Sequence, residues 1–223
     1  MSFFSTVVRG IGVFALFAGL VGCAVEPATQ ALLDAYRINR SEGAQPAAAG
    51  LKPGFKYLRV QIDGREIFLV RGYVDQHPDG SVEVWYSADA DALRLRDGRV
   101  VGVTMKSGPE WLNVSFAHLP GWDAVGSRTE FDRVRDVGPG YRYGIKEKML
   151  LRRIAPPDNS QLRLVPASSL TWFEEGVQGV SDIPPARYAV DSGAHRVVYG
   201  EQCLSSEYCF SWQDWSSTGM GAR

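Results

Sequence analysis

The chain has 223 residues, of which 45% are hydrophobic, 11% aromatic and 22% charged, and its formal net charge is -1. This composition excludes an intrinsically disordered chain, and the lack of a basic excess argues against a protein that binds nucleic-acid backbones. Three His and three Cys do not favour a metal site built from these residues, and a mean hydropathy of -0.14 excludes a membrane protein with many spans. The length is sufficient to bury a core in one domain or at most two.

Residues 1–22 have the features of a secretory signal. They contain no Asp or Glu and one formal side-chain charge, Arg9, which precedes an apolar run from Ile11 to Val21. That run is too short to cross a bilayer as a helix, which needs about 20 residues, and it has the length of a signal-peptide core. We therefore expect residues 1–22 to be removed.

The signal ends in Leu20-Val21-Gly22-Cys23, which resembles a bacterial lipobox. In such signals the cysteine becomes the first mature residue and is acylated on its sulfur and its amino group. Two or more acyl chains hold a protein stably at a membrane, so we expect a lipid anchor at Cys23. The alternative is a free cysteine that closes an ordinary signal. Ala24 follows, whereas Asp at that position retains many Gram-negative lipoproteins in the inner membrane, so outer-membrane localisation is expected.

The two remaining cysteines, Cys203 and Cys209, are six residues apart. The periplasm is oxidising, so a pair there predicts a disulfide that closes a short loop and contributes about 2 kcal/mol. A redox-active pair is the alternative. The spacing is not Cys-x-x-Cys and no helix start follows, which favours the structural disulfide.

Residues 23–50 are predicted to contain the lipidated cysteine, a short helix and a tether. The helix is expected over 28–38, where Leu32, Leu33 and Tyr36 share one face. Residues 41–50 lack large apolar side chains, as is typical of a flexible connection. The helix either packs on the domain edge or contacts a partner.

From residue 57 the apolar side chains recur at every second position, which predicts β-strands. Three pairs, Asp63-Gly64, Asp79-Gly80 and Asp97-Gly98, separate apolar runs. Such pairs favour tight hairpins because a type I′ turn needs positive φ at both central residues. Residues 57–105 therefore predict an antiparallel meander of about six strands. Five of the apolar runs in this meander are 57–62, 65–70, 81–86, 92–96 and 99–105.

The second half is less regular but also resembles β-structure. Residues 137–144 indicate a loop or a twisted strand pair, and 168–175 a strand or a short helix. Many short strands with Gly-rich turns are typical of barrels and sandwiches. We predict one all-β domain over residues 51–223, a single antiparallel β-barrel-like or sandwich domain. The remaining predicted strands are 111–116, 149–154, 161–165, 187–191 and 195–199.

Two strings of residues resemble a known family. Val84–Asp89 reads Val-Trp-Tyr-Ser-Ala-Asp, and Leu93–Val101 reads Leu-Arg-Leu-Arg-Asp-Gly-Arg-Val-Val. Both resemble the core motif of the YjbF/GfcB-type lipoproteins, the group 4 capsule polysaccharide lipoprotein family, and Arg187–Asp191 resembles that family's C-terminal strand. Ala189 stands where the family often has Trp, and residues 203–223 match no motif of it. The resemblance implies a β-barrel-like periplasmic lipoprotein, encoded with genes for exopolysaccharide production or export, and implies no catalytic residue.

The first of these strings also has a physical interpretation of its own. On an alternating strand, Trp85 and Tyr86 face opposite sides, so we expect one ring in the core. Asp89 and Asp91 suit a turn, in which short carboxylates accept hydrogen bonds from local N–H groups.

Catalytic motifs are sparse. The chain has no Gly-x-Ser-x-Gly elbow and no phosphate-binding loop. Its three histidines are His77, His118 and His195, and the first two precede turn sequences, which favours solvated turn residues over catalytic bases. A sugar-cleaving pair of carboxylates is an alternative because any two acids can converge in a fold. The candidates near aromatic residues are Glu110, Glu130, Asp132, Glu174 and Glu175.

Aromatic side chains are the stronger indication of function. Their faces stack on sugar rings, and exposed aromatic residues mark protein interfaces. Trp172, Tyr141 and Tyr143 add to an aromatic content larger than a simple core needs. Trp212 and Trp215, beside the cysteine pair, either pack the tail onto the barrel or contact a ligand. We predict glycan or partner contacts at Trp111, Trp122, Trp212 and Trp215.

Together these features predict a lipoprotein that is anchored in the outer membrane by its lipid, faces the periplasm and is not an enzyme. It would aid exopolysaccharide or capsule assembly or export by binding the polysaccharide or the export proteins. Two alternatives are a polysaccharide-modifying enzyme with paired carboxylates and a lipid-carrying barrel, which would need an apolar cavity. No cofactor, metal ion or nucleic acid is expected.

Overall fold

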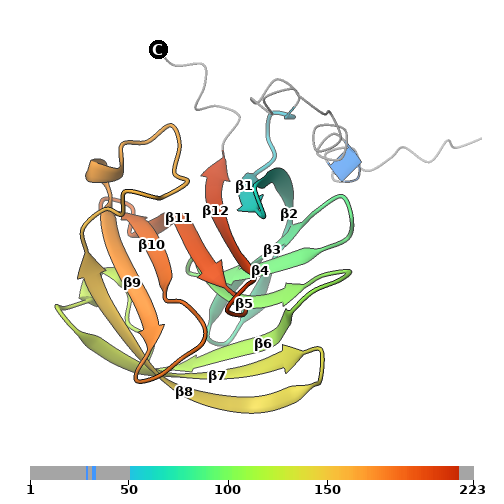
Figure 1. Cartoon of the computed structure of the whole chain (residues 1–223). Coiled ribbons are helices and arrows are strands. Elements are labelled where there is room, and N and C mark those ends of the chain that lie inside the picture. The colour runs from blue at the N-terminus through green and yellow to red at the C-terminus, as the bar shows by residue number, and fades with distance from the viewer. Residues whose placement is uncertain (1–28, 30–31, 34–50, 216–223) are drawn as a thin grey trace, which may run out of the picture.

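Each strand of the protein pairs with its neighbours in the chain, and the first strand also pairs with the last, which closes a barrel (Figure 1). The computed structural model describes residue 29, residues 32–33 and residues 51–215. The predicted all-β, barrel-like fold is confirmed. The twelve antiparallel strands are β1 (Tyr57–Ile62), β2 (Arg65–His77), β3 (Gly80–Tyr86), β4 (Ala92–Arg96), β5 (Arg99–Thr104), β6 (Glu110–Ala117), β7 (Thr129–Gly138), β8 (Arg142–Ile154), β9 (Thr171–Val177), β10 (Ala186–Asp191), β11 (Arg196–Cys203) and β12 (Cys209–Trp215), with 3-10 turns η1 (Trp122–Ala124) and η2 (Ala167–Ser169).

The Asp-Gly pairs form the predicted hairpin turns, two of them with the expected backbone. Asp63-Gly64 has φ values of 48° and 71°, and Asp97-Gly98 has 50° and 74°. Both turns therefore have positive φ at both central residues, as a type I′ turn requires. At Asp79-Gly80 only the glycine has positive φ, 117°, and it is already the first residue of β3.

Two strands were not expected from the sequence, and one expected strand is absent. In β7 the buried side chains recur at every second position, but they include Arg133 and Arg135 as well as Phe131 and Val137, so the strand has no apolar period. β12 was not predicted either. Residues 161–165, predicted as a strand, instead belong to a connection without regular pairing. Residues 168–175, predicted as a strand or a short helix, contain the end of the 3-10 turn η2 followed by most of strand β9.

The connection over residues 155–170 packs on the outside of the barrel. Leu162 contacts the outward-facing cluster of Trp172 and Tyr199. The backbone N–H of Arg163 donates to Gln213 Oε1 at 3.0 Å, and Arg59 donates to the carbonyl of Gln161 at 3.0 Å. The connection therefore covers polar and aromatic side chains of β1, β9, β11 and β12 that would otherwise be exposed.

Only three residues of the predicted N-terminal helix, Thr29, Leu32 and Leu33, are described, and all three are helical. Leu32 packs against an outward-facing cluster that includes Tyr57 and Trp215. This contact agrees with a helix that packs on the domain edge. The signal segment, the predicted lipidation site Cys23 and the predicted tether lie outside the described residues.

A buried ion pair crosses the barrel interior. Arg99 on β5 donates from Nε to Glu175 Oε2 on β9 at 2.9 Å, and the two side chains are 0% and 2% exposed. The guanidinium carbon of Arg99 lies 3.6 Å from the centroid of a Trp122 ring, and Tyr188 packs on the same indole. Burial, together with the nearby charge of Glu175, raises the pKa of Tyr188 well above its ordinary value. The interior is therefore filled by stacked aromatic and charged groups as well as by aliphatic side chains.

A second interior cluster joins β7 to β8. Arg133 and Arg135 both donate to Glu147, at 2.7 Å and at 2.5 to 2.7 Å, and both guanidinium groups lie against the Trp111 ring. Burial opposes the charged form of Glu147. Hydrogen bonds and charges from Arg135 and Arg133 outweigh burial and hold the pKa of Glu147 below its ordinary value of 4.5.

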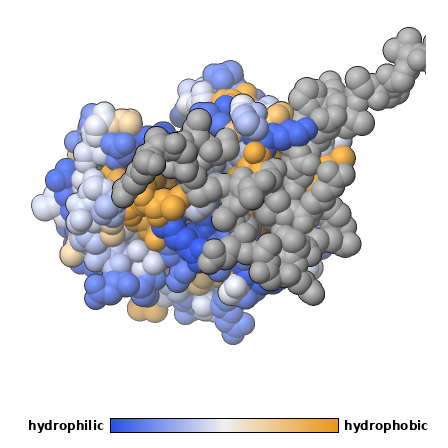
Figure 2. All heavy atoms as spheres, turned by 90° about the horizontal axis from the view of Figure 1, so that it is seen from above, coloured by the Kyte–Doolittle hydropathy of each residue, from blue (hydrophilic) through white to orange (hydrophobic). Residues whose placement is uncertain are grey.

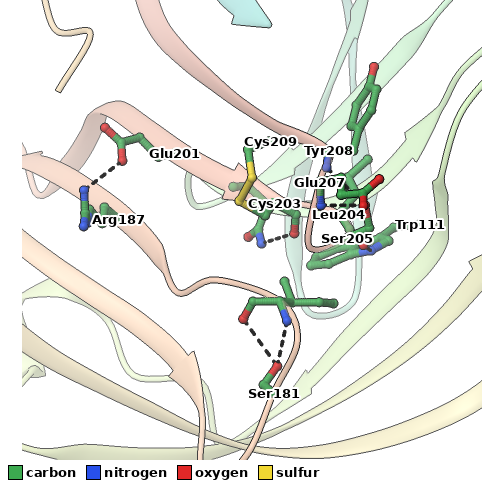
Figure 3. Close-up of a disulfide and its surroundings, with 12 residues drawn as sticks. Trp111, Ser181, Arg187, Glu201, Cys203, Leu204, Ser205, Glu207, Tyr208 and Cys209 are labelled. Atoms are coloured by element: carbon green, nitrogen blue, oxygen red, sulfur yellow. Dashed lines mark hydrogen bonds and ion pairs between the residues drawn. A yellow bond between two sulfur atoms is a disulfide. The ribbon is translucent and has the colours of Figure 1, made fainter. Parts of the chain in front are cut away.

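The disulfide staples the end of the barrel where β11 meets β12 (Figure 3). Cys203 and Cys209 lie opposite one another in register, and the predicted disulfide is present. The enclosed hairpin places Leu204 in the core, where its carbonyl accepts from Trp111 Nε1 at 3.2 Å. Tyr208 contacts Met105 at the same end. The stapled hairpin therefore closes one end of the barrel.

We predict that Glu147→Gln lowers the free energy of unfolding by about 3 kcal/mol, because it leaves two buried guanidinium groups without their carboxylate. A folded-state pKa below 4.5 means that the wild-type contribution is present above that pH and is lost as the pH falls through the folded pKa. Denaturant titrations from neutral to acid pH measure both effects. Glu174→Gln, which removes an exposed pair with Arg152, is the control and should cost no more than about 1 kcal/mol.

We predict that Cys203→Ser combined with Cys209→Ser lowers the free energy of unfolding by about 2 kcal/mol, because the unfolded chain is no longer restrained by a short loop. Chemical denaturation with and without reductant measures this loss. Reductant should destabilise the wild-type protein and leave the double variant unchanged. Equal stability of the two proteins without reductant would contradict a structural role.

Candidate functional site

A cavity of about 740 Å³ opens at the end of the barrel opposite the disulfide. We call it the mouth. The start of β1, the end of β12, the β2–β3 hairpin, the β4–β5 turn and the β10–β11 turn surround it. The connection between β6 and β7 adds Leu119, Pro120 and Gly121 to the wall. Both ends of the barrel sequence therefore meet at the mouth.

The floor of the mouth is apolar and aromatic. Leu58, Trp85, Leu95 and Trp212 line it, and each is less than 5% exposed. The ring of Trp212 lies over Gly200, where any β-carbon would overlap it, so this glycine allows the indole to face inward. Trp85 belongs to the Trp-Tyr-Ser-Ala-Asp string, and its burial in the core confirms that one ring of that string points inward.

The rest of that string forms the expected turn and an outward-facing contact. Ser87 Oγ bonds the carboxylate of Asp91 at 3.1 Å and accepts from the backbone N–H groups of Asp89 and Asp91 at 3.2 and 3.0 Å. Tyr86 faces outward and packs near Tyr73. The string therefore shapes the strand and the turn, and only Trp85 contributes to the mouth.

Charged side chains form pairs around the mouth. Arg71 donates to Glu83 at 2.8 Å and Arg96 to Asp79 at 3.4 Å. A third pair joins Arg196 of β11 to an aspartate of β12, Asp214. These guanidinium groups thus have carboxylate partners within the protein.

Asp97 is the mouth residue whose carboxyl has a shifted pKa. Burial raises it, and the positive charge of Arg99, at 3.5 Å, and a hydrogen bond from Trp122 only partly offset that effect. Asp97 therefore holds its proton to a higher pH than an ordinary aspartate. The negative charge of Asp123, in the connection between β6 and β7, raises the pKa of Asp97 further, so a second carboxylate lies near it.

The four tryptophans predicted as glycan or partner contacts are all buried, which agrees with the alternative that Trp212 and Trp215 pack the tail onto the barrel. Trp111 and Trp122 stack with interior arginines. Trp215 faces outward but is covered by Leu51 and Phe55, among others, while Trp212 alone lines the mouth. Their exposed fractions are 1% for Trp111, 3% for Trp122, 2% for Trp212 and 6% for Trp215.

The candidate acids do not form a pair. Glu130 lies beside Arg128, Asp132 beside Lys148 and Glu174 beside Arg152, all on the outer surface, whereas Glu175 bonds Arg99 inside the barrel. Glu110 accepts from the Met105 backbone N–H at 3.0 Å. His77 ends β2 directly before the turn that leads to β3, and His118 lies in a bend after β6. His195 lies in a turn and borders the mouth.

Two exposed aromatic residues lie at the other end of the barrel. Tyr141 and Tyr143, on the β7–β8 hairpin, are 67% and 66% exposed, and their rings are nearly parallel with centroids 6.4 Å apart. Viewed from above, the described surface is largely hydrophilic with apolar side chains grouped near its centre (Figure 2). Sequence reasoning noted both tyrosines but could not separate them from buried aromatic residues.

An apolar cavity of about 150 Å³ lies between β1, β2, β4, β5 and the stapled hairpin, lined by Ile67, Met105 and Tyr208 among others. A cavity of this size suits a benzene-sized molecule rather than an acyl chain.

No helix within the described residues is long and apolar enough to cross a membrane. No group of three or more His, Cys, Asp or Glu side chains in residues 51–215 is arranged to hold a metal ion.

Comparisons with known proteins establish the fold of this chain. No protein-family model and no curated protein sequence matches it. Among solved structures it is similar to the crystal structure of the hypothetical lipoprotein YmcC from Escherichia coli K12, with a TM-score of 0.55 and 15% sequence identity. The match covers 83% of this chain and 89% of that one. The two proteins therefore share a fold.

We predict that the fluorescence of the folded protein is blue-shifted and resists quenching by iodide, because all six indoles are buried. Unfolding in guanidinium chloride should restore quenching to the level of free tryptophan. Strong quenching of the folded state would show that at least one of these rings has an exposed face.

Proposed function

We propose that this protein is an outer-membrane lipoprotein whose barrel faces the periplasm and binds a polysaccharide, or the proteins that assemble or export it, without catalysis. The lipobox at Cys23 supports the anchor. The resemblance of Val84–Asp89 and Leu93–Val101 to capsule-associated lipoproteins supports the polysaccharide role. The shared fold with a protein described as a hypothetical lipoprotein agrees with the anchor.

The observation that carries this proposal is the mouth. A cavity of about 740 Å³ falls within the range of small-molecule binding sites, and it combines an aromatic floor with polar walls. Three of its four carboxylates, Glu83, Asp79 and Asp214, are held by arginines, which suits recognition of a ligand better than proton transfer to it.

We predict that deletion of the gene lowers the amount of polysaccharide at the cell surface, because its assembly or export loses a binding component. Extraction and colorimetric quantification of surface polysaccharide measures the change. Re-expression of the wild-type chain should restore it. Normal polysaccharide in the deletion strain would count heavily against the proposed function.

We predict that Cys23→Ser moves the protein from the membrane fraction to the soluble fraction, because the variant has no thiol to acylate. Immunoblots of separated membranes and soluble extract measure the distribution. The Cys203→Ser and Cys209→Ser double variant, which keeps Cys23, should stay with the membrane. Retention of Cys23→Ser in membranes would refute the lipid anchor.

A further inference from the structure

The charges that line the mouth are balanced. Lys56, Arg71, Arg96 and Arg196 are matched by Asp79, Glu83, Asp97 and Asp214. All three of these arginines are paired with carboxylates, as described above. A site that attracts an anionic ligand needs a surplus of cations, and the mouth has none.

Paired guanidinium and carboxylate groups still offer hydrogen bonds. A guanidinium has five N–H donors and a carboxylate about four acceptor positions, so a pair such as Arg71 and Glu83 keeps free capacity of both kinds. Sugar hydroxyl groups both donate and accept. A row of neighbouring hydroxyls therefore complements these pairs without separating them.

Two hydrogen-bond donors of the mouth have no acceptor. Trp85 Nε1 and Arg96 Nε are buried and have no hydrogen-bond partner among the described residues, although both side chains line the mouth. A buried donor without an acceptor costs about 1–3 kcal/mol. A small rotation of either side chain toward a ligand oxygen would remove that cost.

From these observations we propose that the mouth binds uncharged sugar residues of a polysaccharide. The inference rests on the proposed function and specifies its ligand. Hydroxyl groups engage the Arg71–Glu83 and Arg196–Asp214 pairs, and a further hydroxyl accepts a hydrogen bond from the unpartnered N–H of Trp85 when that indole rotates toward the ligand.

The test uses the purified full chain and the exopolysaccharide extracted from the strain that carries the gene. One sample of polysaccharide is left intact, and in another the carboxyl groups are reduced to alcohols. Binding is measured by calorimetry between about 0.01 M and about 1 M salt, over which the Debye length falls from about 30 Å to about 3 Å. We expect both samples to bind with affinities that agree within about twofold across this range.

The variant Arg71→Ala with Glu83→Ala removes one mouth pair and preserves net charge. It should weaken binding at least about tenfold. Arg152→Ala with Glu174→Ala removes a similar cross-strand pair from the outer surface and should leave binding within about twofold of wild type. Ser81→Trp, at an exposed position on the mouth wall, should also weaken binding without removing a charge.

Binding that requires the carboxyl groups, that falls steeply with salt, or that survives both mouth variants would overturn the inference. The inference would also be overturned if neither polysaccharide sample bound to the chain, even if the chain bound a protein through the mouth. If it bound a protein and the deletion strain lacked surface polysaccharide, the proposed function would still hold. If the polysaccharide bound at the mouth but the deletion strain had normal surface polysaccharide, the binding site would be supported and the proposed function rejected.

Discussion

The bond between Arg99 and Glu175 is the interaction on which the interior of this barrel depends. It joins β5 to β9, two strands that three others separate around the wall. Barrel diameter grows with strand number, and eight strands already enclose a space that side chains just fill. The interior of a twelve-stranded barrel is wider, so longer side chains are needed to reach across it. Arginine is long, and its planar guanidinium can stack on an aromatic ring. Arg99 stacks on Trp122, and Arg135 on Trp111, so each cation is compensated by a carboxylate and a ring.

This packing determines where the protein can bind. The ion pair and its aromatic neighbours fill the interior beside the Asp97-Gly98 turn, and the stapled hairpin closes the end near Leu204. What remains open is the mouth, where Trp85 and Trp212 form a floor instead of a passage. The start of β1 also lies at the mouth. A polysaccharide held there would lie at the end of the barrel from which the chain leads back to its predicted lipid.

Much of the fold follows from local sequence, whereas the site does not. The hairpins at Asp63-Gly64 and Asp97-Gly98 follow from backbone preference alone, and the disulfide follows from the count and spacing of cysteines. Strand β7 was missed because inward arginines break the apolar pattern that predicts a buried face. The burial of the tryptophans could not be predicted for a related reason. Composition shows how many rings there are, but the position of each ring along its strand decides which side of the wall it faces. Trp212 and Trp215 lie three apart on one strand, so they face opposite sides of the wall. The mouth itself comes from strand ends far apart in sequence, and only Trp85 carried a local signal.

The central claim is that sugar residues settle on the mouth floor beside Trp85. The most direct measurement is the indole N–H region of a ¹⁵N-correlated NMR spectrum, which resolves the six tryptophans separately. On addition of the carboxyl-reduced exopolysaccharide, the Trp85 signal should shift most, since its N–H gains an acceptor, and the Trp212 signal should shift less. Trp111, Trp172 and Trp215, which lie away from the mouth, should not move. An unchanged Trp85 signal, with perturbations confined to other rings, would contradict the account.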